Sequence, residues 1–121
     1  MKKSKLENLL QMEGIPTDKE ILFVCSYGLI RSRGLAKHLR RRGYMHVNSG
    51  GVLWNRLRNL NPFAIKDYML ENAEYIIAVE PKIGDMINAL YALKRDQRLI
   101  LLNAPAGSGS LYYQAFMELI S

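Results

Sequence analysis

Short apolar segments alternate with helix-like segments along the whole chain, and this alternation constrains the fold more than any other feature. The sequence predicts strands over residues 21–25, 75–81 and 98–103, and within residues 44–51 a strand that runs into a glycine turn. It predicts helices over residues 32–43, 61–73, 83–90 and 111–120, preceded by a helix near the N-terminus. Strands joined by helical crossovers pair in parallel. We therefore expect the α/β class, with an open parallel sheet that helices cover on both faces.

Local signals mark several of the expected helix ends. "SKLE" at residues 4–7 is typical of a capping box, with Ser4 as the cap and Glu7 three residues later. Gly43 is a stop signal for the second helix. Asn61 as a cap and Pro62 at the first helical position predict the start of the third helix.

The size of the chain fits one domain over residues 1–121. Its 121 residues, 49% of them hydrophobic, can build one ordinary core. No apolar run approaches the roughly 20 residues that a membrane span needs. Charged residues also interrupt the apolar positions near the N-terminus, unlike the core of a signal peptide. We expect a cytoplasmic protein with no membrane partner.

The chain has a single cysteine, Cys25. One cysteine cannot form an internal disulfide or a cluster of thiolate metal ligands. Cys25 ends the first expected strand, and open parallel sheets bind ligands beyond the carboxyl ends of their strands. Cys25 is therefore either a small buried residue, as many cysteines are, or a reactive group at the usual site of such a sheet.

The segment that follows, "CSYGLIRS" at residues 25–32, favours the reactive interpretation. Successive backbone N–H groups in a tight turn before a helix can form a nest for a phosphate group. Arg31 can bind two phosphate oxygens through its planar guanidinium. The candidate phosphate-binding residues are Ser26, Tyr27, Gly28, Leu29, Ile30 and Arg31.

The same positive environment favours the thiolate form of the cysteine, to which Ser32 can donate a hydrogen bond. A thiolate below an anion nest can attack phosphorus and form a cysteinyl phosphate. The sequence therefore predicts Cys25, Arg31 and Ser32 as catalytic residues.

A cysteine, five residues, an arginine and a serine directly after the first strand resemble the signature of the low-molecular-weight protein tyrosine phosphatases and their shorter relatives. "NSGG" at residues 48–51 is similar to the turn after the family's second strand, and "AEYIIAVEPKIGDMI" is similar to its third strand and next helix. The resemblance covers most of residues 21–120 and leaves residues 1–19 outside it, as an N-terminal helical extension.

This resemblance implies a flavodoxin-like, open four-stranded parallel sheet of order 2-1-3-4. It implies phosphatase chemistry without a metal or cofactor. The implied substrate is a phosphotyrosine-like ester or another phosphate monoester, a phosphoprotein included.

The sequence departs from the family's pattern at two places. Gly28 occupies the position of an asparagine that helps to hold the family's loop in shape. The family also has a general-acid aspartate beside a proline after the fourth strand, but this chain has no aspartate after Asp96. Asn103 and Ala106 flank Pro105 there, and neither can donate a proton to a leaving group. Glu80 is the candidate replacement; the alternative is that it orients the loop or is solvated.

Two functional hypotheses remain open. The first is a cysteine-dependent phosphatase, and the second is a module of the same fold that binds a phosphorylated or other anionic partner without efficient turnover. Arsenate reductases share this fold and loop, but an internal thiol relay needs further cysteines. With one cysteine, that chemistry requires an external thiol.

Other features carry weaker hypotheses. Basic residues gather in "RSRGLAKHLRRRG", which could bind RNA, an acidic partner or an acidic phosphopeptide, or be a solvated helix face. No recognised nucleic-acid module is visible, so we do not expect a nucleic-acid partner. His38 and His46 lack the spaced partners of a metal site. Tyr27 and Trp54 could flank a phosphate pocket as aromatic walls, although Trp54 fits a core position equally well.

Overall fold

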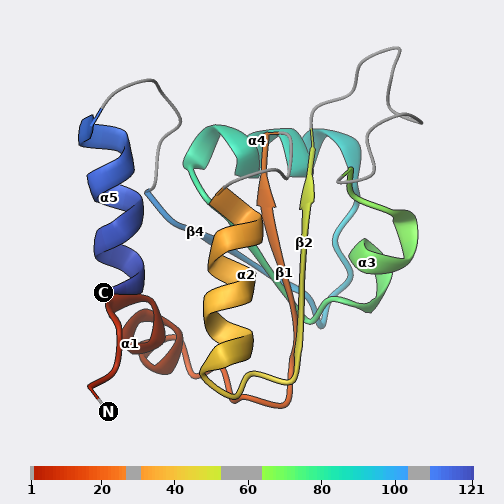
Figure 1. The fold of residues 1–121 in the computed structure, drawn as a ribbon. Coiled ribbons are helices and arrows are strands. Elements are labelled where there is room, and N and C mark those ends of the chain that lie inside the picture. Colours follow the sequence, from red (N-terminus) through yellow and green to blue (C-terminus); the bar gives the residue numbers. More distant parts are fainter. Residues whose placement is uncertain (1, 27–30, 53–63, 104–109) are drawn as a thin grey trace.

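The chain folds around one parallel sheet in a computed structural model that describes residues 2–26, 31–52, 64–103 and 110–121 (Figure 1). The strand order is β2-β1-β3-β4, and every neighbouring pair is parallel. The predicted fold class and strand order are confirmed. In chain order the elements are α1 (Lys5–Met12), β1 (Glu20–Cys25), α2 (Arg31–Arg41), β2 (His46–Gly51), α3 (Asp67–Asn72), β3 (Tyr75–Ala78), α4 (Pro81–Leu90), β4 (Arg98–Leu101) and α5 (Ser110–Ile120).

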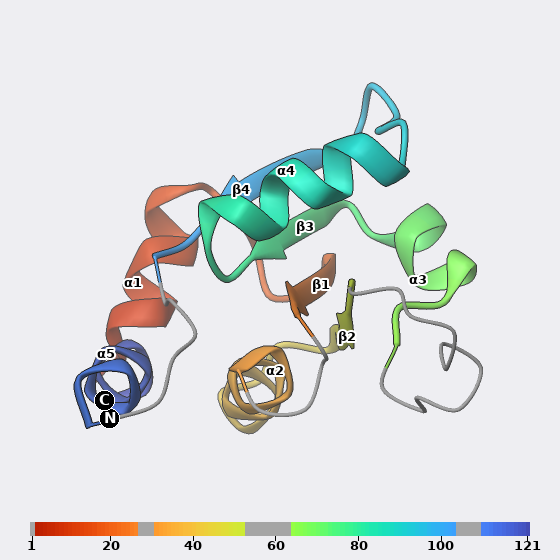
Figure 2. The ribbon, with the colours of Figure 1, turned by 90° about the horizontal axis from the view of Figure 1, so that it is seen from above.

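The central strand β1 holds the core together. Its residues from Ile21 to Cys25 are all buried, because β2 and β3 flank it and helices cover both faces. Helix α2 lies on one face and α4 on the other (Figure 2). Leu35 and Leu39 of α2 are fully buried. On the other face, Ile83 of α4 is fully buried and Ile87 is almost fully buried. Each such side chain contributes about 1.5–3 kcal/mol through its burial.

Helix α1 belongs to this core. Its capping box is present, because the Ser4 hydroxyl accepts a hydrogen bond from the Glu7 backbone N–H and the Glu7 carboxylate accepts one from the Ser4 N–H. Leu6 and Leu10 are buried. The Lys5 N–H donates to the Ser121 carbonyl at 3.4 Å, so the start of α1 lies next to the C-terminus (Figure 1). The segment expected as an extension therefore packs as part of the fold.

The start of the third helix was predicted wrongly. Residues 61–63, with the expected cap Asn61, lie outside the described residues. Ala64 forms a parallel β-bridge with Gly51, and Lys66 is the extended residue before α3, which begins only at Asp67. Ile65 is buried, but against the sheet rather than on a helix face: a Cβ at Gly50 would lie 2.9 Å from its Cγ1. Tertiary packing here overrides the local helix signal.

Three strand ends also differ from the sequence prediction. The segment Asn48–Gly51 lies within β2 rather than in a turn after it. Strand β3 ends at Ala78, because Pro81 begins α4 with Glu80 as its N-cap residue. Strand β4 ends at Leu101, before the predicted end at residue 103. The end of α2 is as expected, with Gly43 in the left-handed region at φ 95°.

No described helix has the length and apolar character needed to cross a membrane.

A polar cluster joins α1 to α2. The Ser4 hydroxyl lies 2.8 Å from Nε2 of His38, and the Glu7 carboxylate lies 3.0 Å from Nε of Arg42. Burial would raise the pKa of Glu7, but hydrogen bonds from Ser4 and the charges of Arg42 and His38 outweigh it and lower this pKa. Burial also lowers the pKa of His38, helped by Arg42 and Arg41 against the opposing charge of Glu7.

We expect the protein to lose stability as the pH falls from 7.5 to 5. A lowered pKa means that His38 takes up its proton more readily in the unfolded chain. Its contribution is therefore complete above its ordinary value of about 6.5 and is lost as the pH falls below it. Glu7 adds a second loss below about 4.5, with the same sign. The free energy of unfolding by urea, measured from pH 7.5 to 5, reports the contribution of His38.

His38→Gln should flatten the dependence between pH 7.5 and 5. His46→Gln is the matched control, because it removes the other histidine, at the exposed start of β2. An unchanged pH dependence in His38→Gln would contradict this assignment.

Candidate functional site

Cys25 lies at the carboxyl end of the central strand, where the sequence places the reactive group. It is the last residue of β1 and pairs with Gly51 of β2. The Val52 N–H donates to the Cys25 carbonyl at 2.9 Å, and the Val79 N–H donates to the Val24 carbonyl at 3.0 Å. Backbone hydrogen bonds from both sides thus fix the residue. Only 3% of Cys25 is exposed.

Ser32 holds the sulfur from the first turn of α2. Its Oγ lies 3.0 Å from Sγ of Cys25, and the residue is fully buried. The alternative acceptor for its proton, the Gly50 carbonyl, is 3.5 Å away. When the sulfur is ionised, the hydroxyl therefore has a charged acceptor at the shorter distance. This geometry fits the role of a thiolate stabiliser.

Arg31 begins α2 and is held by contacts with two other described residues. Its guanidinium donates to Oγ of Ser26 at 3.2 Å, which spans the loop from its first residue to its end. A second terminal nitrogen lies 3.6 Å from the Glu80 carboxylate. Both charged side chains are 12% exposed. The guanidinium is thus largely fixed before any anion arrives.

Glu80 lies at the site, as its position after the third strand predicts. Strand β3 is next to β1 in the sheet, so the residues that follow β3 and β1 are neighbours. Glu80 is extended, precedes α4, and makes no side-chain hydrogen bond to that helix's N-terminus. Its carboxylate instead pairs with Arg31. This contact with the guanidinium favours an orienting role over that of a proton donor.

Several predicted site residues lie outside the described residues. Tyr27, Gly28, Leu29 and Ile30, which would supply most of the backbone cradle, are among them, as are Trp54 and residues 104–109. Of the expected phosphate-binding set, the structure therefore places Ser26 and Arg31. It brings them together with Cys25 and Ser32 at the end of β1.

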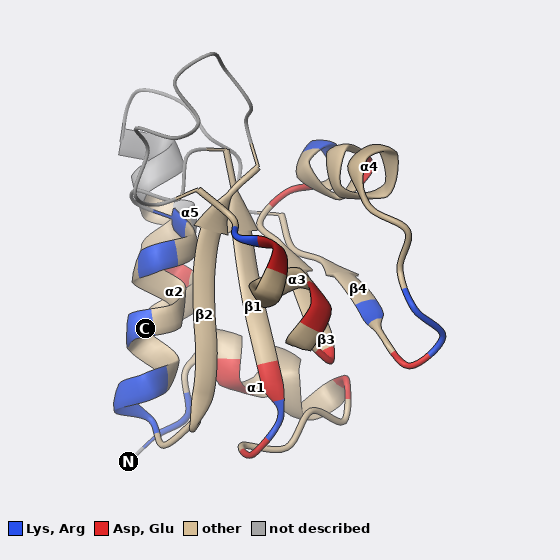
Figure 3. Cartoon of the chain, turned by 90° about the vertical axis from the view of Figure 1, so that its right-hand side faces the viewer, with Lys and Arg blue, Asp and Glu red and all other residues tan. Residues whose placement is uncertain are grey.

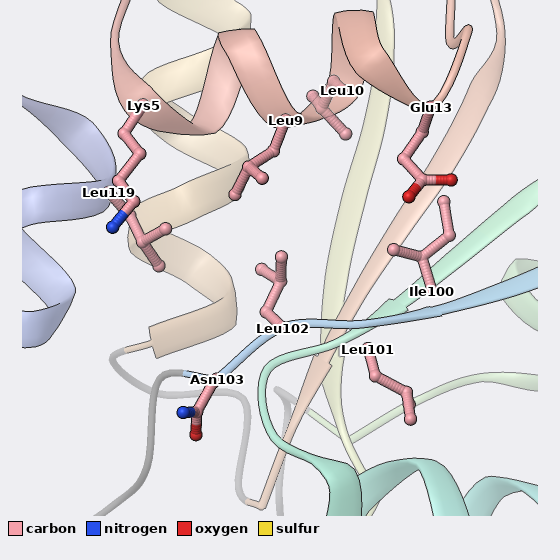
Figure 4. A pocket seen from close by; sticks show the side chains of 9 residues that line it. All are labelled: Lys5, Leu9, Leu10, Glu13, Ile100, Leu101, Leu102, Asn103 and Leu119. Atoms are coloured by element: carbon pink, nitrogen blue, oxygen red, sulfur yellow. The ribbon is translucent and has the colours of Figure 1, made fainter.

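A cavity of about 260 Å³ lies elsewhere, between α1, β4 and α5 (Figure 4). Its lining is mostly leucine and isoleucine, with Lys5, Glu13 and Asn103 as its polar residues. It contains none of the residues around Cys25. An apolar cavity does not suit a phosphate dianion, so we do not assign the anion site to it. Nowhere in the described ranges do three metal-ligating side chains gather.

Sequence reasoning missed Gly50, which shapes the site from β2. A Cβ there would lie about 3 Å from the backbone of Ile65 as well as its side chain, so the bridge between Gly51 and Ala64 leaves no room for one. The glycine's carbonyl faces Ser32. The pair of glycines at residues 50–51 is the available signal, but such a pair equally predicts a turn.

We expect Cys25 to be alkylated by iodoacetamide at pH 7, and inorganic phosphate to protect it. The chain has one cysteine, so the label reports this sulfur alone. Ser32→Ala should slow the reaction several-fold, because the thiolate loses its donor. Mass spectrometry of the labelled fraction over time measures both effects. Labelling that phosphate does not slow would contradict an anion site over the sulfur.

The fold is similar to two solved structures. One is a YwlE mutant from Bacillus subtilis, with a TM-score of 0.60 and 19% identity over 85% of this chain and 92% of that one. The other is a thioredoxin-dependent arsenate reductase, Cg_ArsC1', from Corynebacterium glutamicum, with a TM-score of 0.60 and 16% identity. That match covers 96% of this chain and 64% of the reductase.

No protein-family model and no curated protein sequence matches the chain. The family resemblance therefore rests on the cysteine motif and on the fold that surrounds it. The chain has the flavodoxin-like fold of the low-molecular-weight protein tyrosine phosphatases, with its single cysteine at the carboxyl end of the central strand.

Proposed function

We propose that the protein is a phosphomonoester hydrolase that works through a cysteinyl-phosphate intermediate on a phosphotyrosine-like ester. The observation that carries this proposal is the contact of 3.0 Å between Cys25 Sγ and Ser32 Oγ, next to a fixed arginine. A nucleophile, its hydrogen-bond donor and an anion-binding group thus meet at one strand end. Parallel α/β sheets place ligand sites at such an end.

The chemistry follows from these positions. The thiolate of Cys25 attacks phosphorus, so a sulfur–phosphorus bond forms while the bond from phosphorus to the ester oxygen breaks. Arg31 binds the equatorial oxygens and offsets their charge. Water then attacks the phosphorus, the sulfur–phosphorus bond breaks, and dihydrogen phosphate leaves with both protons of the water. Ser32 stabilises the thiolate that is released. The leaving oxygen needs a proton, or must be stable as an anion.

The source of that proton separates the two functional hypotheses. Asp96 is the last aspartate of the chain, and Glu118 in α5 is the only acidic residue after it. Loss of a general acid typically slows such a reaction by 10²- to 10⁴-fold. We infer that turnover is efficient for esters with acidic leaving groups and slow for phosphotyrosine itself.

The alternative function is a binding module that keeps the anion site without turnover. The missing aspartate supports it. The pairing of Arg31 with Glu80 is compatible with either function, because a guanidinium already fixed in place can bind phosphate whether or not the sulfur attacks. Arsenate reduction through an internal thiol relay is not proposed, since one cysteine cannot supply the second thiol.

The deciding experiment compares p-nitrophenyl phosphate with phosphotyrosine as substrates. We expect turnover of the first to exceed that of the second by at least about 10²-fold, because p-nitrophenolate leaves without a proton. Cys25→Ser should abolish both reactions. Continuous release of nitrophenolate and of phosphate gives the rates.

Each other outcome has a meaning. Equal turnover of both esters would show that a general acid is present after all. Absence of turnover together with binding of vanadate would favour the binding module. Turnover that survives Cys25→Ser would overturn the cysteinyl-phosphate mechanism.

Glu80→Gln tests whether Glu80 replaces the missing acid. Because its carboxylate pairs with Arg31, we expect the substitution to change kcat for the two esters by the same factor, within about threefold. A proton donor would instead show a loss on phosphotyrosine that p-nitrophenyl phosphate does not share, of about 10²-fold or more. Ser26→Ala is the matched control, since it removes the other described contact of Arg31 and carries no proton-donating carboxyl group.

A further inference from the structure

The whole net charge of the protein is carried by α2 and the residue after it. Residues 31–42 contain six lysines and arginines and no acidic residue, and the net charge is +6. The other eleven basic residues are balanced by eleven aspartates and glutamates elsewhere in the chain. Figure 3 shows the blue segments that recur along α2. The charge is therefore concentrated on the helix that begins at the candidate site.

Arg31, Arg40 and Arg42 make contacts that tie α2 and its ends to the rest of the fold. Arg31 pairs with Glu80, and Arg42 pairs with Glu7. Arg40 donates from Nε and a terminal nitrogen to the Val47 carbonyl, at 2.9 and 2.6 Å, which ties α2 to β2. These contacts position the helix and its ends.

The other three form an exposed stripe, which we call the α2 basic stripe: Arg33, Lys37 and Arg41. All three are exposed, and they follow one another at intervals of four residues. Such positions share one face of a helix, with a rise of about 6 Å per step. No carboxylate among the described residues pairs with Lys37 or Arg41. The positive charge of Arg41 also helps to lower the pKa of the nearby His38.

We propose that the α2 basic stripe binds an acidic polypeptide segment next to the phosphate ester of a phosphoprotein substrate. The stripe begins two residues after Arg31, so a chain leaving the site along α2 meets it at once. In an extended peptide, side chains on one face recur about every 6.4–6.8 Å, close to the step of the stripe. Alternating glutamates or aspartates can therefore meet successive cations.

A polypeptide fits this surface better than a nucleic acid. Surfaces that bind single strands combine cations with aromatic side chains on which bases stack. Helix α2, "RSRGLAKHLRR", contains no phenylalanine, tyrosine or tryptophan. The inference rests on the proposed function for its substrate class, but the surface can be tested by binding alone.

The test uses Cys25→Ser protein and fluorescence anisotropy, so that no probe is consumed. The probes are a phosphotyrosine peptide with glutamates at alternate positions, the same peptide with glutamines, and a single-stranded RNA of equal charge. We expect the glutamate peptide to bind about 3- to 10-fold more tightly than the glutamine peptide at 50 mM salt. The difference should shrink at 200 mM salt.

Lys37→Gln with Arg41→Gln should remove this preference. Lys66→Gln with Arg95→Gln is the matched control, because it removes the same charge from exposed positions outside α2. The preference should survive there. Thermal unfolding followed by circular dichroism verifies that both double variants are folded.

Equal affinity for the two peptides would overturn the inference, as would an equal loss in both double variants. RNA that binds more tightly than the glutamate peptide, and that depends on Lys37 and Arg41, would replace it with a nucleic-acid surface. Hydrolysis of p-nitrophenyl phosphate by the unmodified protein separates the two proposals. A preference for the glutamate peptide without hydrolysis would support the peptide-binding surface and contradict the phosphatase activity. Hydrolysis without the preference would support the phosphatase activity and contradict the peptide-binding surface.

Discussion

The burial of β1 between two parallel neighbours is the constraint on which the rest of the structure depends. A strand buried on both faces must be apolar along its length, and from Ile21 to Cys25 this one is. Its hydrogen bonds to β2 and β3 fix where it ends and therefore where the sulfur lies. Helix α2 begins at Arg31, so Arg31 and Ser32 lie near the sulfur in the first turn of a helix whose Leu35 and Leu39 are buried in the core. Core packing and site geometry thus share one cause.

Much of this could be predicted from the sequence, because strong signals repeat along the chain. The four apolar runs and the helical spacing between them give the parallel sheet, and the cysteine motif gives Cys25, Arg31 and Ser32. Those signals are local. The start of α3 could not be predicted in the same way, because the bridge between Gly51 and Ala64 joins two separate segments, and Ala64 and Lys66 are not helical although they lie inside the predicted helix. The close approach of Ile65 to Gly50 is hidden in the sequence for the same reason.

The candidate site also combines features that local sequence signals predict with features that depend on contacts between distant segments. Sequence spacing places an arginine and a serine near the sulfur, but it leaves open whether Glu80 is a proton donor, an orienting group or a solvated residue. The contact with Arg31 favours an orienting role, and it depends on β3 lying beside β1. The position of α1 likewise depends on contacts between residues that are far apart in the sequence. Its capping box can be predicted from residues 4–7 alone. The ion pair between Glu7 and Arg42 cannot, because it depends on the packing of α1 against the end of α2.

The concentration of positive charge on α2 makes one side of the molecule more attractive to anions. An anion near α2 is attracted toward this helix, and the helix starts next to the sulfur. Within about 10 Å at moderate ionic strength, such an attraction can guide diffusing anions. The rate of encounter with an anionic molecule should therefore depend on salt, even for a molecule too small to touch the far end of the helix.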